Sequence, residues 1–152
     1  MTDVAIESAN QLTKDIADVI VLLEKQVFAT PLSLTILENE IRGQSNCLIS
    51  IAYDSAKPVG FKIGYEYHSD HEYFYSWNGG VLPAYRRRGI ARRLMLQQHE
   101  FAKKHGYKYI RTHTKNKYRS MLLFNIAEGV DVTGVYKKLR EESHGIILEK
   151  KL

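Results

Sequence analysis

The segment that most constrains the fold covers residues 79–95: two glycines, a short apolar step, a run of arginines and another glycine. The aromatic-rich residues 73–77 before it have the composition of a β-strand. From Gly89 to His105, apolar residues recur at helical spacing, with basic residues and Glu100 on the opposite side. The sequence therefore predicts a strand and a helix joined by a short basic turn.

The turn has the chemistry of an anion-binding site. Backbone N–H groups at the start of a helix have no intrahelical partner and lie at the positive end of the helix dipole. Gly89 lets an anion approach that backbone, and Arg86, Arg87 and Arg88 add positive charge. The P-loop pattern and the three-glycine dinucleotide pattern are both absent. We interpret the turn as a phosphate cradle, with an ordinary basic surface turn as the alternative.

Composition indicates one globular domain over residues 1–152, with 44% hydrophobic residues. The net charge of +5 indicates an anionic partner: nucleic acid, a membrane surface or a phosphorylated cofactor. Cys47 is the single cysteine, which excludes an internal disulfide, and its apolar surroundings predict a buried residue. No apolar run is long enough to span a membrane and no leader-like segment is visible, so we expect a cytoplasmic protein.

Periodicity and turn residues predict the other elements. Strands are expected at residues 3–7, 47–53, 59–67, 72–82, 107–114, 130–138 and 145–152. Besides the helix after Gly89, one helix is capped by Thr13 and runs to about residue 28, one is capped by Ser33 and ended by Gly43, and one lies between Asn116 and Gly129. This order indicates an α/β (α+β) fold: a mixed, mostly antiparallel seven-stranded sheet with about four helices on its faces.

The glycine pair allows two interpretations. Asn78-Gly79 is a strong hairpin signal, but too few residues follow it before Pro83 to form a returning strand. We therefore predict a bulge or a close backbone approach at Gly79 and Gly80. A bulge there would separate this strand from its parallel neighbour at 107–114, and Gly80→Val would crowd the resulting cleft.

The turn also resembles a known motif. Arg86-x-x-Gly89-x-Ala91, preceded by Val81-x-Pro83, resembles the pyrophosphate loop of the GNAT-type N-acetyltransferase superfamily, whose pattern is Gln/Arg-x-x-Gly-x-Gly/Ala. The order of predicted elements is similar to the GNAT fold over nearly the full length.

A second likeness lies downstream. The series Asn116, Ser120, Met121, Asn125 and Gly129 resembles the fourth-helix pattern of the same superfamily. It departs from that pattern in two ways. Asn116 lies two residues further upstream than usual, so Tyr118 competes for its place, and Val130 stands where the family commonly has an aromatic residue.

The resemblance implies acetyl-CoA-dependent acetylation of a primary amine, by direct attack in a ternary complex and without a metal. It implies that acetyl-CoA is held by two segments and an asparagine near the middle of the cofactor: Arg87, Arg88, Gly89, Ile90, Ala91 and Arg92 at the pyrophosphate; Gly79, Gly80 and Val81 along the pantetheine; and Asn116.

The catalytic positions differ from the family. Tyr75 stands where many relatives place a Glu, and a phenol with a pKa near 10 is a poor base at neutral pH. Tyr75 either orients a water or is a packed aromatic, and Glu66 or Glu72 are alternative bases. Asn125 stands at the position often held by Tyr. It either steadies the sulfur or bonds to its own helix backbone.

The acceptor is open among peptide N-termini, lysine side chains, polyamines and small antibiotics. Glu24, Glu38 and Glu40 either attract a cationic amine or form a solvated helix face. The loop at residues 68–71, with two histidines and an aspartate, is interpreted as a polar turn rather than a metal site. A homodimer is left open. The competing functions are a non-catalytic acyl-CoA-binding regulator and a nucleic-acid-binding module built on the clustered arginines.

Overall fold

The computed structural model describes residues 3–140 and 142–152, which form seven strands, four α-helices and a 3-10 helix. The strands are β1 (Val4–Ala9), β2 (Leu48–Asp54), β3 (Lys57–Glu66), β4 (Tyr73–Val81), β5 (Tyr109–Lys115), β6 (Asp131–Tyr136) and β7 (Gly145–Lys151). The helices are α1 (Lys14–Val27), α2 (Leu34–Ile41), α3 (Ile90–Lys104) and α4 (Arg119–Ala127). All predicted strands and helices are confirmed, while the 3-10 helix η1 (Pro83–Tyr85) was not predicted.

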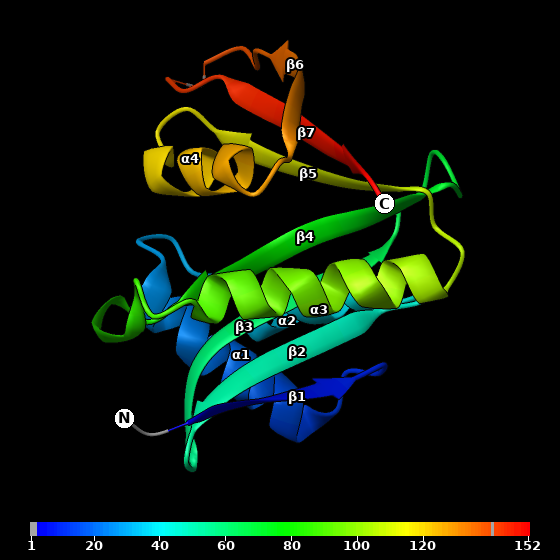
Figure 1. Ribbon diagram of the computed structural model, residues 1–152. Coiled ribbons are helices and arrows are strands. Elements are labelled where there is room, and N and C mark those ends of the chain that lie inside the picture. The colour runs from blue at the N-terminus through cyan, green and yellow to red at the C-terminus, as the bar shows by residue number, and fades with distance from the viewer. Residues whose placement is uncertain (1–2, 141) are drawn as a thin grey trace.

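The strands form one sheet in the order β1-β2-β3-β4-β5-β7-β6. Neighbours are antiparallel except β4 and β5, which are parallel. A parallel pair needs a crossover connection, and α3 supplies it. Figure 1 shows α3 lying across the sheet beside β4. The predicted mixed, mostly antiparallel fold is confirmed, including the parallel pair at its centre.

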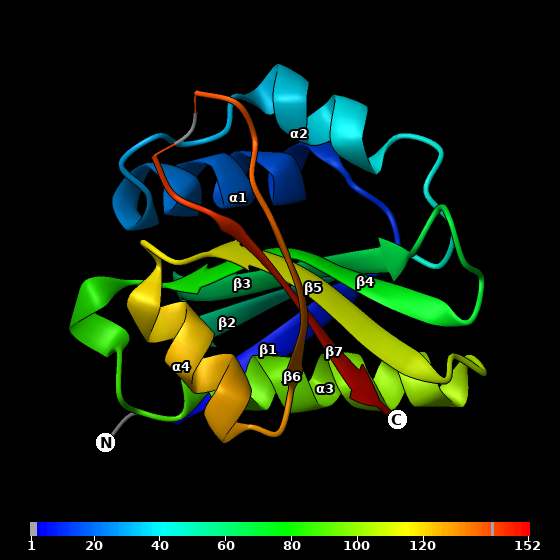
Figure 2. The ribbon, with the colours of Figure 1, turned by 90° about the horizontal axis from the view of Figure 1, so that it is seen from above.

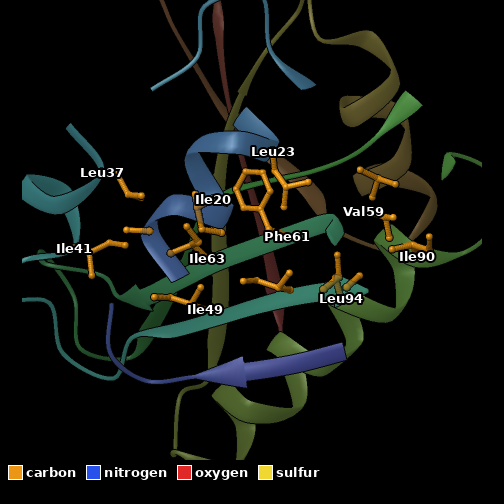
Figure 3. Close-up of a cluster of buried hydrophobic side chains, with 14 of the residues drawn as sticks. Ile20, Leu23, Leu37, Ile41, Ile49, Val59, Phe61, Ile63, Ile90 and Leu94 are labelled. Atoms are coloured by element: carbon orange, nitrogen blue, oxygen red, sulfur yellow. The ribbon is translucent and has the colours of Figure 1, made fainter. Parts of the chain in front are cut away.

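Helices cover both faces of the sheet (Figure 2): α1 and α2 lie on one, and α3 and α4 on the other. In the main core, Ile20 and Leu23 of α1 and Leu37 of α2 pack against Phe61 and Ile63 of β3 (Figure 3), and all five are fully buried. Burial of these side chains, each worth about 1.5–3 kcal/mol, fixes α1 and α2 above β3 and β4. Among the described residues, no helix combines the length and apolar character needed to cross a bilayer.

The predicted caps fix where the first two helices begin. Thr13 Oγ1 accepts a hydrogen bond from the N–H of Ile16, and Ser33 Oγ accepts one from the N–H of Ile36, both at 3.3 Å. Gly43, with φ +75°, follows α2 as expected for a left-handed helix end. These caps define a short loop between α1 and α2.

Candidate functional site

The central strands β4 and β5 are paired only over the first part of their length. Their parallel pairing runs from Tyr73–Tyr109 to Ser76–Thr112, where Thr112 Oγ1 also donates to the carbonyl of Ser76 at 2.9 Å. Beyond that point β4 continues to Val81 and β5 to Lys115 without pairing to each other. We call this segment, residues 77–81 of β4 and 113–115 of β5, the strand opening; Figure 1 shows the two strands diverging there.

A β-bulge lies at the start of the strand opening, but not where it was predicted. The β3–β4 register shifts so that Ile63 pairs with Asn78 while Gly64 pairs with Ser76, which leaves Trp77 as the extra residue. The prediction of a bulge at Gly79 and Gly80 is therefore wrong by two residues, because both glycines pair regularly with β3. The expected separation of β4 from β5 is confirmed.

The two glycines instead allow close packing. A Cβ on Gly79 would lie 2.9 Å from the carbonyl oxygen of Phe61, so the predicted close backbone approach is confirmed there. A Cβ on Gly80 would lie 2.6 Å from Cγ1 of Val27 on α1. The expectation that Gly80→Val crowds a cleft is thus wrong, because its side chain would enter the packing of α1 against the sheet.

After the strand opening, the basic turn is held by side chains of its own. The hydroxyl of Tyr85 donates to Asp54 Oδ2 at 2.7 Å, and the Arg88 guanidinium lies 4.9 Å from the Tyr85 ring centre. Arg86 Nε donates to the carbonyl of Val81 at 3.2 Å, which ties the turn to the end of β4. The backbone is left-handed at Arg87 (φ 60°) and Gly89 (φ 76°), so the chain reverses sharply before α3.

The start of α3 leaves room and donors for an anion. The first helical bond runs from the N–H of Arg93 to the carbonyl of Gly89 at 3.0 Å, so the N–H groups of the first turn precede the helical ladder. The position of a Cβ on Gly89 has open space around it, with nothing within 4 Å. A side chain there would fill this space, so the residues present fit a diphosphate seated on the helix start.

Most of the clustered arginines have intramolecular roles. Arg92 Nε donates to Glu128 Oε2 at 3.1 Å, and Arg93 Nη1 donates to the carbonyl of Val4 at 2.7 Å, which join α3 to α4 and β1. With Arg86 bound to Val81, these contacts organise the turn and its helix. Arg86, Arg92 and Arg93 therefore contact the fold around the helix start while they remain exposed at the surface.

Asn116 precedes α4, and Asn125 lies in its last turn. The backbone N–H of Asn116, just after β5, donates to the carbonyl of His144 at 3.1 Å and joins α4's entry to the β6–β7 connection. The buried Asn125 donates its amide to the carbonyl of Met121 at 2.9 Å. The interpretation of Asn125 as a helix asparagine bonded to backbone is confirmed by this contact.

Tyr75 is a packed aromatic beside the last paired rungs of β4 and β5. Its ring lies 5.8 Å from Tyr65 and 5.5 Å from Tyr67, both edge-on, and 5.2 Å from His113. Burial, the first cause, and the nearby phenols raise the pKa of Tyr75 to about 12. Tyr75 is thus protonated at neutral pH and cannot act as a base there.

The chain is similar to known proteins in sequence and in fold. The family model described as "Acetyltransferase (GNAT) family" matches residues 16–124.

The chain belongs to the GNAT acetyltransferase family.

Solved structures show the same fold at low sequence identity. The ribosomal-protein-S18-alanine N-acetyltransferase of Escherichia coli has a TM-score of 0.80 at 16% identity, with 97% of this chain and 94% of that one covered. A putative GNAT-family acetyltransferase of Desulfovibrio desulfuricans gives 0.82 at 16%, covering 97% and 99%. NAA60 of Arabidopsis thaliana in complex with acetyl-CoA gives 0.80 at 12%, covering 99% of both chains. By sequence, no curated protein matches the chain.

In this GNAT protein, the acidic residues of α1 and α2 do not form one surface. Glu24 is buried; its carboxylate accepts from the N–H of Leu32 at 3.1 Å and from the amide of Asn78 at 2.5 Å. The interpretation of Glu24 as part of a solvated helix face is wrong, because the buried side chain joins the α1–α2 loop to β4. Glu40 accepts from the hydroxyl of Tyr65 at 2.5 Å, and Glu38 is exposed.

The alternative bases lie at the far end of β3 and β4. Glu66 accepts from the hydroxyl of Tyr107 at 2.9 Å and faces His71 at 2.7 Å, and these bonds hold the pKa of Glu66 below its usual value. Glu72 pairs with Lys108 at 2.5 Å. Glu66 pairs with Phe74 beside the paired segment of β4 and β5, and Glu72 precedes that segment, so both carboxylates lie away from the strand opening. Among the described residues, no group of acidic, histidine or cysteine side chains has the arrangement of a metal site.

Sequence reasoning missed one polar residue beside the strand opening. Lys62 stands in the middle of β3, within an otherwise apolar or glycine run from Val59 to Gly64. It pairs with Gly79 across the strands and is partly buried. A lysine inside a strand that is apolar on both faces is the signal that could have found it.

Proposed function

We propose that the chain transfers the acetyl group of acetyl-CoA to a primary amine, by direct attack in a ternary complex. The observation that carries this proposal is the strand opening, which ends next to the helix start at Gly89. A thioester cofactor with a diphosphate needs both features: an unpaired strand edge for its amide arm and backbone donors for its phosphates.

The residues proposed to hold acetyl-CoA lie in three places. On the edge of β4 they are Gly79, Gly80 and Val81, and before α4 there is Asn116. In the basic turn and the first turn of α3 they are Arg87, Arg88, Gly89, Ile90, Ala91 and Arg92. Support comes from the unpaired edge of β4 and from the open space at Gly89. Acetyl-CoA supplies the activated acyl group, and the chain supplies its position and the exclusion of water. No metal is part of the proposal.

We propose that the amine approaches from the α1 and α2 face. That face carries an aromatic wall of Tyr65, Tyr67, Tyr75 and His113, and the Arg111 guanidinium lies 4.9 Å from the Tyr67 ring centre. With a pKa of about 12, Tyr75 is proposed to position the acceptor through its hydroxyl and leave deprotonation to water. Small molecules and peptides both remain acceptors to test.

Calorimetry with acetyl-CoA tests the binding site directly. Gly89→Glu places a side chain and a negative charge in the open space at the helix start, and we expect binding to weaken by at least 100-fold. Gly43→Glu is the matched control, because Gly43 has φ +75° and the same open surroundings but lies after α2. Unchanged affinity in folded Gly89→Glu protein would refute the site.

A second candidate function is a non-catalytic acyl-CoA-binding regulator. Two observations favour it, because each leaves a residue at a usual catalytic position without a proton-transfer role. The amide of Asn125 donates to the carbonyl of Met121, and the pKa of Tyr75 is high. Turnover separates the two functions. Release of free CoA in the presence of a panel of primary amines supports the enzyme, and tight acetyl-CoA binding with no turnover on any of them supports the regulator.

A further inference from the structure

Lys62 lies against the strand that forms one edge of the strand opening. A Cβ on its partner Gly79 would lie 3.4 Å from both Cα and Cγ of Lys62. The start of the lysine's aliphatic stem therefore lies against β4 at a position where β4 has no side chain. Because Gly79 is within the strand opening, the lysine is next to the proposed path of the acyl-CoA.

Lys62 acts on a buried histidine of α3. His99 on α3 is buried, and burial first, then Lys62 and Lys150, lowers its pKa to about 4, so His99 is uncharged at neutral pH. Lys62 on β3 and Lys150 on β7 thus both act on His99, Lys62 from beside Gly79 of the strand opening and Lys150 from beside Ile110 in the paired part of β5. Lys150 Nζ donates to the carbonyl of Glu128, whereas no hydrogen bond or ion pair of Lys62 is found among the described residues.

Burial lowers the pKa of Lys62 to about 8, with no carboxylate of the described residues acting on it. A positive charge held in such a place without a counter-charge is costly, and an anion that arrives beside it relieves the cost. Lys62 is thus suited to a reaction in which negative charge develops nearby.

One buried neighbour of Lys62 also lacks hydrogen-bond partners. Gln98 of α3 is 1% exposed, and both polar atoms of its amide lack a partner among the described residues. Gln98 Nε2 lies over Gly64, two residues along the strand from Lys62 and on the same face, at 2.5 Å from the position of a Cβ there. Ser50, also buried, pairs with Lys62 across β2 and β3. The sheet beneath α3 therefore has a polar interior around the lysine.

We propose that Lys62 is the proton donor for the CoA sulfur that leaves during acetyl transfer. In this step the bond between the thioester carbon and sulfur breaks, the electron pair goes to sulfur, and Lys62 Nζ gives it a proton. The amine that attacked loses its own proton to water, and neutral Lys62 regains one from solvent, so the cycle closes without another reactant. This inference rests on the proposed function.

Lys62 fits this step better than the two residues at the family's usual positions. Asn125 has no proton to release and its amide is bound to Met121, and Tyr75 has a pKa of about 12. Thiols have a pKa near 8.5, so a donor with a pKa of about 8 is closely matched to the leaving thiolate.

The test compares Lys62→Met with wild type. We expect kcat to fall by about 100-fold, as is typical when a general acid is lost, with KM for acetyl-CoA nearly unchanged. Wild-type kcat falls as pH rises through about 8 because the donor loses its proton, and this alkaline limb disappears in Lys62→Met. Among the described residues, His99 is the titratable group on which Lys62 acts, and His99 is neutral throughout this range.

A binding measurement gives a readout that does not depend on turnover. The ultraviolet absorbance of the thiolate reports the pKa of the thiol of bound CoA, and a nearby cation lowers that pKa. We expect it to be lower than in free CoA for wild type and for Lys62→Arg, and to rise to the free value in Lys62→Met. Lys62→Arg keeps the charge but cannot release a proton, so its kcat falls as in Lys62→Met.

Lys108→Met is the matched control, since Lys108 is a surface lysine paired with Glu72 and should change neither readout. If Lys62→Met does not fold, the Lys62→Arg comparison and the wild-type pH profile still decide. Wild-type kinetics and thiol pKa preserved in the Lys62 variants overturn the inference and leave the proposed function standing. Failure of wild-type protein to bind acetyl-CoA overturns the proposed function itself.

Discussion

The two faces of the sheet differ at its centre. On the α1 and α2 face two buried polar side chains are paired: Glu24 bonds to Leu32 and Asn78, and Tyr65 bonds to Glu40. On the α3 face Gln98 lacks partners, and Lys62 has no counter-charge among the described residues. Glu24, Tyr65 and Gln98 are all buried, so exposure does not explain the difference between them.

This difference distinguishes buried polar groups that stabilise the fold from buried polar groups that are available to a ligand. A buried group that is paired stabilises the native state, and its removal leaves its partners unsatisfied. A buried group without a partner contributes little or costs stability, so it persists for another reason. Changes on the first face should therefore cost stability, and changes on the second should cost function.

The largest effect on stability is expected from Glu24→Ala. The change leaves the N–H of Leu32 and the amide of Asn78 without their buried acceptor, and we expect a loss of about 3 kcal/mol in the free energy of unfolding. Urea denaturation measures it. Glu38→Ala on the exposed side of α2 is the control, with an effect below about 0.5 kcal/mol. Equal losses in both variants would contradict a structural role for Glu24.

A smaller effect on the same face is expected from Gly80→Ala. The added methyl would approach Cγ1 of Val27 to 2.6 Å, and overpacking of this kind costs about 1–3 kcal/mol. Val27→Ala removes the obstructing atom, so the double variant should recover part of the loss. A double-mutant cycle in thermal unfolding checks this, and strict additivity of the two changes would argue against a direct contact.

The smallest effect is expected on the α3 face, from Gln98→Leu. Leucine replaces a fully buried amide without partners by an apolar side chain, so the free energy of unfolding should stay the same or rise by about 1 kcal/mol. Chemical denaturation with wild type as reference measures the change. A loss as large as that of Glu24→Ala would erase the contrast between the two faces.

Much of the fold could be predicted from the sequence because its signals are local. The caps Thr13 and Ser33 and the strand–turn–helix around Gly89 each lie within a few residues, and the structure confirms them. The strand opening was also predicted, from the glycines that precede Pro83, although the bulge itself is at Trp77.

What the sequence did not reveal depends on contacts between distant residues. Glu24 reads as one charge on an amphipathic helix, and only the fold brings it to Asn78, 54 residues away. The sequence marks Lys62 as a lysine in an apolar strand, but only the fold places it beside Gly79 of β4. Register and burial decide such cases, and neither is fixed by local pattern.

The Glu24 carboxylate would couple the binding of acetyl-CoA to the binding of the amine. One oxygen receives the loop that follows α1 and the other receives Asn78, which precedes the glycines of the β4 edge. A ligand that shifts the α1–α2 loop or Asn78 would change the hydrogen bonding of the other segment, because both bond to the Glu24 carboxylate. Thermodynamic linkage makes such an influence mutual: if acetyl-CoA tightens the protein's hold on the amine by some factor, the amine must tighten its hold on acetyl-CoA by the same factor.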